Sequence, residues 1–224
     1  MPKLVLIRHG ESIANFSNVY TGWNDVELTA RGIRQAQTAG ELIAGLSDFE
    51  PTCIHTSVLK RAIMTANIVA AASDFLYVPI MKTWRLNERH YGKLRGLNKE
   101  ASRVIFGEEQ VLEWRRGFYA IPPAGEPVSG RAYHNYDMPS LPRAESLYQT
   151  QQRLLPYYQD CVANRLLQGE DQLIVAHGSS LRALIKKLEK ISDTAIVQVE
   201  VPNAEPLVYT MDQQLRLVNR EILH

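Results

Sequence analysis

The chain has 224 residues, a hydrophobic content of 45% and a formal net charge of +1. A chain of this length can bury a substantial core, so residues 1–224 are expected to form a single domain. The near-zero net charge argues against a nucleic-acid binder, which usually carries a basic excess. Cys53 and Cys161 are too few for a disulfide framework, and no apolar run is long enough to span a membrane. We therefore expect a cytoplasmic protein with neither a nucleic-acid nor a membrane partner.

The first elements are a strand and a helix joined by a polar loop. Residues 4–7 form a continuous apolar run, which is typical of a strand buried on both faces. An Asn-rich loop over residues 11–25 follows. Thr29 can then cap a helix over residues 30–45.

The same alternation recurs twice further along the chain. Residues 53–56 predict a second strand, and Ser57 is expected to cap the next helix. In that helix the residues that recur at helical spacing are Val58, Ala62, Thr65, Ala66 and Val69. Residues 173–176 predict another buried strand, followed by an amphipathic helix over residues 180–189. Strands that alternate with helices predict an α/β three-layer sandwich, with a mostly parallel central sheet flanked by helices.

The least regular stretch extends from residue 122 to residue 142. Its turn formers are Pro122, Pro123, Pro127, Pro139, Pro142, Gly125 and Gly130. Long loops inside compact domains are usually functional or mobile. We therefore interpret residues 88–142 as a cap, or lid, inserted over the sheet.

Chemically reactive side chains follow three of the predicted strands. They are Arg8, His9, Gly10, Glu11 and Ser12 after the first, Ser57 and Arg61 after the second, and His177, Gly178 and Ser179 after the third. Ligands of open parallel sheets bind beyond the carboxyl ends of the strands. The sequence therefore predicts a site at this edge of the sheet.

Two histidines and two arginines at one sheet edge suit a phosphoryl group. Arginine offers a planar, permanently charged fork to phosphate oxygens. A histidine nitrogen can attack phosphorus, and His9 is the expected nucleophile. His177, if protonated, would add a cation where transition-state charge spreads. Two alternatives stay open: the histidines are inert strand-end residues, or they bind a metal, although neither has a His or Cys at ligand spacing.

A second polar cluster lies between residues 84 and 116. Glu88 is the natural general acid–base, since burial can raise the pKa of a carboxyl toward neutrality. Tyr91, Lys99, Arg115 and Arg116 could hold the rest of an anionic substrate. The alternative is a charged surface face on which these side chains form exposed ion pairs.

Motifs of a known family lie along nearly the whole chain, at residues 6–12, 20–25, 28–32, 57–62, 84–92, 96–99, 107–111, 114–116, 141–147 and 176–182. The sequence resembles the 2,3-bisphosphoglycerate-dependent phosphoglycerate mutases of the histidine phosphatase superfamily. The most specific part is the block from residue 84 to residue 116, which general phosphatases of the superfamily lack. The resemblance implies the phosphoglycerate mutase-like fold.

The resemblance also implies roles for individual residues. His9 would be the phosphorylated nucleophile, with Arg8, Arg61 and His177 around the phosphate and Glu88 as proton donor and acceptor. The implied ligand contacts are Arg8, His9, Gly10, Glu11, Ser12, Asn15, Thr21, Gly22, Arg61, Glu88, Arg89, His90, Tyr91, Lys99, Arg115, Arg116, Gly178 and Ser179. The implied isomerase interconverts 2- and 3-phosphoglycerate in glycolysis and gluconeogenesis, is primed by 2,3-bisphosphoglycerate, needs no metal and forms a homo-oligomer, with a dimer expected.

The sequence departs from the mutases in three places. Ser179 replaces the usual Asn, residues 201–206 replace a Pro-Thr-Gly-Ile-Pro turn and introduce Glu205, and the long Lys- and Ala-rich tail of many relatives is missing after His224. A lid closed less completely would admit water, so the nearest alternative is a histidine-type phosphatase acting on phosphoglycerates or other small phosphate esters. A catalytically silent sugar-phosphate sensor is the alternative from another class, but His9, Glu88 and the arginines are all present.

Overall fold

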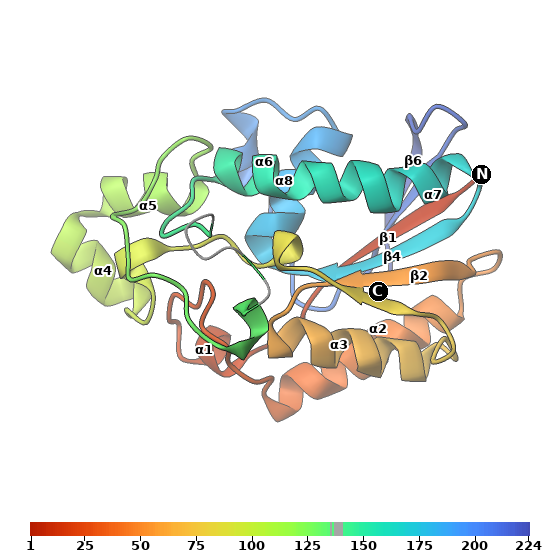
Figure 1. Cartoon of the computed structure of the whole chain (residues 1–224), viewed down its shortest axis with the longest axis horizontal. Coiled ribbons are helices and arrows are strands. Elements are labelled where there is room, and N and C mark those ends of the chain that lie inside the picture. Colours follow the sequence, from red (N-terminus) through yellow and green to blue (C-terminus); the bar gives the residue numbers. More distant parts are fainter. Residues whose placement is uncertain (135, 137–140) are drawn as a thin grey trace.

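The computed structural model describes residues 1–134, 136 and 141–224, and centres on a six-stranded sheet (Figure 1). Its strands are β1 (Lys3–Arg8), β2 (Pro51–Thr56), β3 (Ile80–Lys82), β4 (Asp171–Ala176), β5 (Leu207–Met211) and β6 (Leu217–Ile222). They lie side by side in the order β3-β2-β4-β1-β5-β6. The neighbours from β3 to β1 pair in parallel, and β5 is antiparallel to both β1 and β6. The predicted mostly parallel sheet is confirmed.

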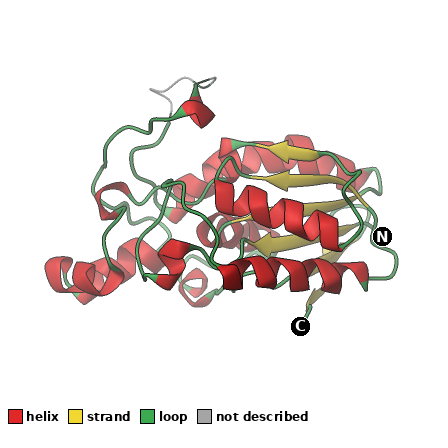
Figure 2. Cartoon of the chain, turned by 90° about the horizontal axis from the view of Figure 1, so that it is seen from below, coloured by secondary structure: helices red, strands yellow, loops and turns green. Residues whose placement is uncertain are grey.

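Helices cover both faces of this sheet. The four long ones are α2 (Ala30–Ala44), α3 (Lys60–Ala72), α6 (Leu147–Tyr157) and α8 (Gly178–Leu188). Leu4 and Leu6 of β1 belong to the core beneath α6 and α8. Val5 and Ile7 belong to the core beneath α2 and α3, because successive side chains of a strand point to opposite faces. Figures 1 and 2 show the resulting three layers, which confirms the expected sandwich.

Shorter elements complete the chain: α1 (Ile13–Phe16), α4 (Lys99–Phe106), α5 (Glu108–Arg116), α7 (Asn164–Leu167), a π-helical turn (Tyr158–Ala163) and 3₁₀ turns at Trp84–Leu86, Gly92–Leu94, Arg131–Tyr133 and Ala195–Gln198. Within the described part of the chain, no helix is both long and apolar enough to cross a membrane.

The helix caps agree with the sequence at one site and differ at another. Thr29 caps α2 as predicted, its hydroxyl accepting a hydrogen bond from Gly32 N at 3.0 Å. The predicted cap at Ser57 is wrong, because α3 begins only at Lys60. Lys60 N donates instead to Oδ1 of Asp25, at 2.7 Å. A carboxylate from a distant loop therefore satisfies an amide at the start of α3.

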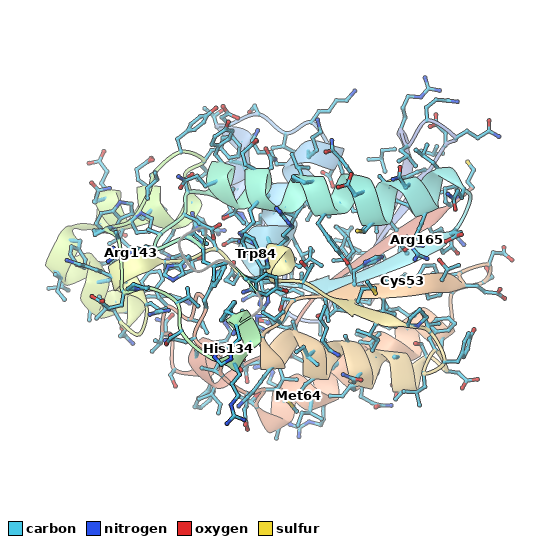
Figure 3. The ribbon with its side chains drawn as sticks, in the orientation of Figure 1. Cys53, Met64, Trp84, His134, Arg143 and Arg165 are labelled. Carbon is cyan, nitrogen blue, oxygen red and sulfur yellow. The ribbon has the colours of Figure 1, made fainter. Side chains whose placement is uncertain are left out.

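The segment over residues 88–142 contains α4, α5 and loops that lie beyond one end of the sheet (Figure 1). Its proline-rich part includes a 3₁₀ turn at Arg131–Tyr133, whose Tyr133 stacks on Trp23 with ring centroids 5.4 Å apart. Pro139 lies outside the described residues. Figure 3 shows Trp84 near the centre of the molecule and Arg143 on the side of these loops. Arg143 Nε donates to Gly125 O at 2.8 Å, so the residue just after the segment is hydrogen-bonded to the segment's proline-rich part.

Candidate active site

The carboxyl ends of three neighbouring strands meet at one edge of the sheet. Arg8 of β1 is in register with Ala176 of β4, and Thr56 of β2 is in register with Val175 of β4. The residues that follow these strands are therefore brought together, as the sequence predicts. His9 and His177 have ring centroids 5.0 Å apart.

His9 is buried and held in one tautomer. Its Nδ1 lies 2.7 Å from Gly10 O, which can only accept, so Nδ1 carries the proton. Its Nε2 lies 3.3 Å from Arg61 Nε and accepts a hydrogen bond from it. Burial, and then the charges of Arg61 and Arg8, hold the pKa of His9 well below its ordinary value. At neutral pH the ring is uncharged and Nε2 keeps the lone pair that a nucleophile needs.

Arg61 places a charged guanidinium beside that nitrogen. It is 1% exposed and donates to the carbonyls of Gly22 and Asn24, both at 2.9 Å. These partners are neutral, so the charge of Arg61 is available to a phosphoryl oxygen. Burial lowers the pKa of Arg61 to about 10, which still leaves it protonated at neutral pH.

His177 is fully buried on the other side of the cluster. Its Nε2 lies 2.8 Å from Ser57 Oγ, and its Nδ1 has no hydrogen-bond partner in the part of the chain that the structure describes. Burial, followed by the charge of Arg61, holds the pKa of His177 well below its ordinary value. The ring is therefore neutral in this structure, and the additional cation expected for a protonated His177 is not present.

Two adjoining cavities open beside this cluster. The inner cavity, of about 90 Å³, is lined by His9, Asn15, Val19, Tyr20, Thr21, Gly22, Arg61, Glu88, Tyr91, Lys99 and Arg115. The outer cavity, of about 180 Å³, is lined by Arg8, Glu88, Tyr91, Arg115, Arg116, Gly178, Ser179, Arg182, Glu200 and Val201. The two share Glu88, Tyr91 and Arg115. Most of the residues expected to touch a ligand line one cavity or both.

Glu88 lies where the cavities adjoin. Its Oε1 accepts hydrogen bonds from the backbone N–H groups of Arg89 and Ser179, at 2.8 and 3.0 Å. Two fixed donors therefore orient the carboxylate, which is 9% exposed. The side-chain amide lost when Asn is replaced by Ser179 plays no part in this contact, because Ser179 uses its backbone.

Two other side chains at these cavities have shifted pKa values. Burial alone raises the pKa of Tyr91, but the charge of Arg89 and hydrogen bonds from Arg89 and Ser179 bring it below its ordinary value. Burial lowers the pKa of Lys99, with further lowering from the charges of Arg115 and Arg8. The phenol and the ammonium group therefore both respond to the surrounding arginines.

Several residues expected to touch a ligand line neither cavity and have partners within the protein. Ser12 caps α1, accepting from Asn15 N at 3.2 Å. Glu11 accepts from the Thr29 hydroxyl at 2.8 Å. A Cβ on Gly10 would lie 2.2 Å from Gly32 O, so this position needs glycine for close approach. These contacts are structural, and ligand contact at the three positions stays a prediction.

Arg89 and His90 are likewise fully buried outside both cavities. Arg89 donates to Arg115 O at 2.6 Å and packs over the Tyr91 ring, 4.8 Å from its centroid. His90 Nδ1 accepts from Gly92 N at 3.1 Å. Arg89 thus contacts two residues that line the cavities, Tyr91 and Arg115, and direct ligand contact by Arg89 and His90 stays a prediction.

Several residues of the site are not predicted from the sequence. Tyr20 lines the inner cavity, and Arg182 and Glu200 line the outer one. Arg182 could have been found from its position one helical turn after Gly178, on the face of α8 that lines the outer cavity. Glu200 could not, because the connection from α8 to β5 has no periodic pattern and the sequence drew attention to Glu205 instead.

The connection from α8 to β5 also holds the carboxyl end of β1 in place. Asn203 Nδ2 donates to His9 O at 2.6 Å, and Arg8 Nη1 donates to Val201 O at 2.8 Å. The altered residues 201–206 therefore contribute directly to the position of the nucleophile. Among residues 1–134, 136 and 141–224, no cluster of three or more His, Cys, Asp or Glu side chains is arranged to hold a metal ion.

The sequence matches a protein-family model and several curated proteins. The model of the histidine phosphatase superfamily (branch 1) matches residues 4–220. The chain is 63% identical to 2,3-bisphosphoglycerate-dependent phosphoglycerate mutase 2 of Lactobacillus johnsonii, over 100% of this chain and 98% of that protein. It is 53% identical to 2,3-bisphosphoglycerate-dependent phosphoglycerate mutase 1 of Latilactobacillus sakei, over 98% and 94%.

A solved mycobacterial glucosyl-3-phosphoglycerate phosphatase shares the fold with a TM-score of 0.76 at 23% identity, over 99% of this chain and 97% of that one. The match to the superfamily model spans nearly the whole chain, and the curated relatives align over nearly their full length. The chain therefore belongs to branch 1 of the histidine phosphatase superfamily.

Proposed function

We propose that this protein interconverts 2-phosphoglycerate and 3-phosphoglycerate through a phosphohistidine at His9, and that 2,3-bisphosphoglycerate primes it. The observation that carries the proposal is the neutral, buried His9 imidazole beside Arg61, with Glu88 lining both adjoining cavities. The names of the relatives with 63% and 53% identity support the same reaction. The phosphatase alternative is not favoured, because the phosphatase neighbour at 23% identity shows only the fold.

The donors around the cavities fit a ligand with several anionic groups. Arg61 and Lys99 line the inner cavity, Arg8 and Arg182 line the outer one, and Arg115 lines both. Arg8 Nε and Arg182 Nε are buried without a hydrogen-bond partner among the described residues. These side chains would hold bisphosphoglycerate, which, when bound, would donate the phosphoryl group that phosphorylates His9. The cationic lining also supports a phosphoglycerate as the small-molecule substrate.

The chain's own residues divide the work of transfer. The lone pair on His9 Nε2 attacks phosphorus while the bond from phosphorus to the leaving oxygen breaks. Arg8, Arg61 and His177 surround the position where the equatorial oxygens gather negative charge. Glu88 gives a proton to the leaving oxygen and takes one from the attacking hydroxyl in the reverse step. Its place where the cavities adjoin suits both directions.

Labelling with isotopic 2,3-bisphosphoglycerate tests the nucleophile. The wild-type protein should give an acid-labile, base-stable phosphoprotein, and the His9→Ala variant should not. The exposed His134 is the matched control, and His134→Ala should label like wild type. Equal labelling of His9→Ala would remove His9 from the mechanism.

A coupled assay on 3-phosphoglycerate tests the reaction itself. We expect 2-phosphoglycerate to form faster when 2,3-bisphosphoglycerate is added, with little free phosphate and with full activity in EDTA. Phosphate release that matches or exceeds isomerisation would point to the hydrolase instead. The organisation as one domain with residues 88–142 as a cap, the homodimer and the cytoplasmic location stay predictions.

A further inference from the structure

The outer cavity contains an acidic side chain that the phosphoryl chemistry does not use. Arg8, Arg115, Arg116 and Arg182 give its wall a strongly cationic character, yet Glu200 also lines it. Glu88 is the other acid there, and its Oε1 is committed to two backbone N–H groups. The proposed transfer uses Glu88 as its acid–base group and gives Glu200 no part.

Glu200 forms an ion pair with Arg116, and both side chains line the outer cavity. Arg116 Nη2 meets Glu200 Oε1, and Arg116 Nη1 donates to Val199 O at 3.4 Å. Both partners of the guanidinium are therefore residues of the connection between α8 and β5. An anionic group entering the outer cavity would have to share Arg116 with this carboxylate or displace it.

Displacement of the Glu200 carboxylate is feasible because Glu200 is much more exposed than Arg116. The Glu200 side chain is 66% exposed and that of Arg116 is 23% exposed. An exposed carboxylate can swing into water and stay solvated, while Arg116 remains on the cavity wall. Exposed ion pairs contribute little to stability, so opening this one leaves the fold intact.

We propose that Glu200 is a specificity-determining residue that competes for Arg116 and so weakens binding of the ligand's second anionic group. This inference rests on the proposed function, in which one phosphate lies at His9 and the carboxylate or second phosphate reaches the outer cavity. Glu200 lines only the outer cavity, so the penalty falls on that second group. A ligand whose phosphate is its only anionic group should not experience it.

The test compares two ligands that differ only in the second anionic group. Dissociation constants for 3-phosphoglycerate and for glycerol 3-phosphate, which lacks the carboxylate, are measured by calorimetry on wild type and on Glu200→Gln. We expect Glu200→Gln to tighten 3-phosphoglycerate binding about twofold to fivefold at low salt, the range of an exposed ion pair. The gain should shrink in high salt, where exposed charges are screened, and glycerol 3-phosphate should bind unchanged.

Glu205→Gln is the matched control, since Glu205 lies in the same connection but lines neither cavity. It should leave both constants unchanged, and circular dichroism should show all variants folded. Unchanged or weaker binding of 3-phosphoglycerate by Glu200→Gln, or equal tightening of both ligands, overturns the role of Glu200 alone. A wild-type protein that neither binds nor isomerises 3-phosphoglycerate overturns the proposed function, and this inference with it.

Discussion

A histidine is a useful nucleophile only if its ring is neutral and the attacking nitrogen carries no proton. The carbonyl of Gly10 fixes the proton on Nδ1 of His9, and burial beside Arg61 keeps the ring uncharged. The same arginine that lowers the pKa of His9 is placed to neutralise an incoming phosphoryl group. One buried cation thus prepares both the nucleophile and its target.

Replacement of Glu88 by Gln tests the proton transfer. Gln keeps an oxygen that accepts from Arg89 N and Ser179 N, so the local structure should persist. It cannot exchange the proton, and we expect isomerase turnover to fall about 10²–10⁴-fold, the usual contribution of general acid–base catalysis. Turnover is measured with the coupled assay, and binding of 3-phosphoglycerate by calorimetry should be largely kept.

Glu108→Gln is the control for this prediction, because Glu108 is an exposed residue in the first turn of α5. It should turn over at the wild-type rate. An unimpaired Glu88→Gln enzyme would assign the acid–base role to another group.

At the scale of elements, α6 fastens the segment that carries Glu88. Arg153 of α6 donates to both oxygens of Glu145, at 2.6 and 3.0 Å, and both side chains are almost fully buried. The same guanidinium also donates to the carbonyls of Trp84, Arg85, Asn87 and Glu88. A single side chain therefore donates hydrogen bonds to four backbone carbonyls of residues 84–88 and holds this stretch against α6.

Arg153→Met should destabilise the protein strongly. It leaves Glu145 as an unpaired buried charge, a situation that typically costs about 3–5 kcal/mol in the free energy of unfolding. Urea denaturation measures the loss. Adding Glu145→Gln should recover part of it, because the unpaired charge is then removed.

The exposed pair of Arg165 with Glu170 supplies the comparison, since its side chains are 43% and 32% exposed. Arg165→Met should cost no more than about 1 kcal/mol. Equal losses in the free energy of unfolding for Arg153→Met and Arg165→Met would contradict the proposed role of Arg153 in holding residues 84–88.

At the scale of the whole molecule, the charge is balanced but unevenly placed. A formal net charge of +1 conceals cavities whose walls carry six cationic side chains, namely Arg8, Arg61, Lys99, Arg115, Arg116 and Arg182. A cleft whose lining is mainly cationic, with only Glu88 and Glu200 opposing among the described residues of the two cavities, concentrates anionic ligands without making the protein a general polyanion binder.

Buried histidines give the whole protein a stability that depends on pH. Burial lowers the pKa of His55 and of His90 to about 4, and the pKa values of His9 and His177 lie well below 6.5. The unfolded chain, with ordinary values near 6.5, binds protons that the folded protein does not. The contribution of neutral histidine is therefore present above about pH 6.5 and is lost as pH falls toward the folded values.

We expect the free energy of unfolding to drop between pH 7.5 and pH 5.5 by about 1.4 kcal/mol per histidine for each unit below pH 6.5. Urea denaturation at several pH values measures this fall. Removing exposed His134 should leave the slope unchanged. A free energy of unfolding that is flat across this range would contradict the neutral, buried state of the four histidines.

The elements that the sequence predicts well are those with a local signal. The apolar runs at residues 4–7 and 173–176 lie within β1 and β4, and Thr29 starts α2 as expected. The sequence does not predict the strands β5 and β6 or the helices α4, α5 and α6. Both faces of β6 are exposed, so its sequence has no strong alternation, and β5 is buried mainly by partners far away in the chain.

The sequence by itself determined the α/β alternation and the reactive residues at three strand ends, because these depend on short-range patterns and on residue type. The tertiary structure decided which of them share a cavity. In the folded chain the Ser57 hydroxyl is hydrogen-bonded to His177, and the Asp25 carboxylate accepts from the first amide of α3. Both contacts depend on which partner the packing brings near. The tertiary structure also paired Glu200 with Arg116, residues from separate elements whose contact no spacing along the chain reveals.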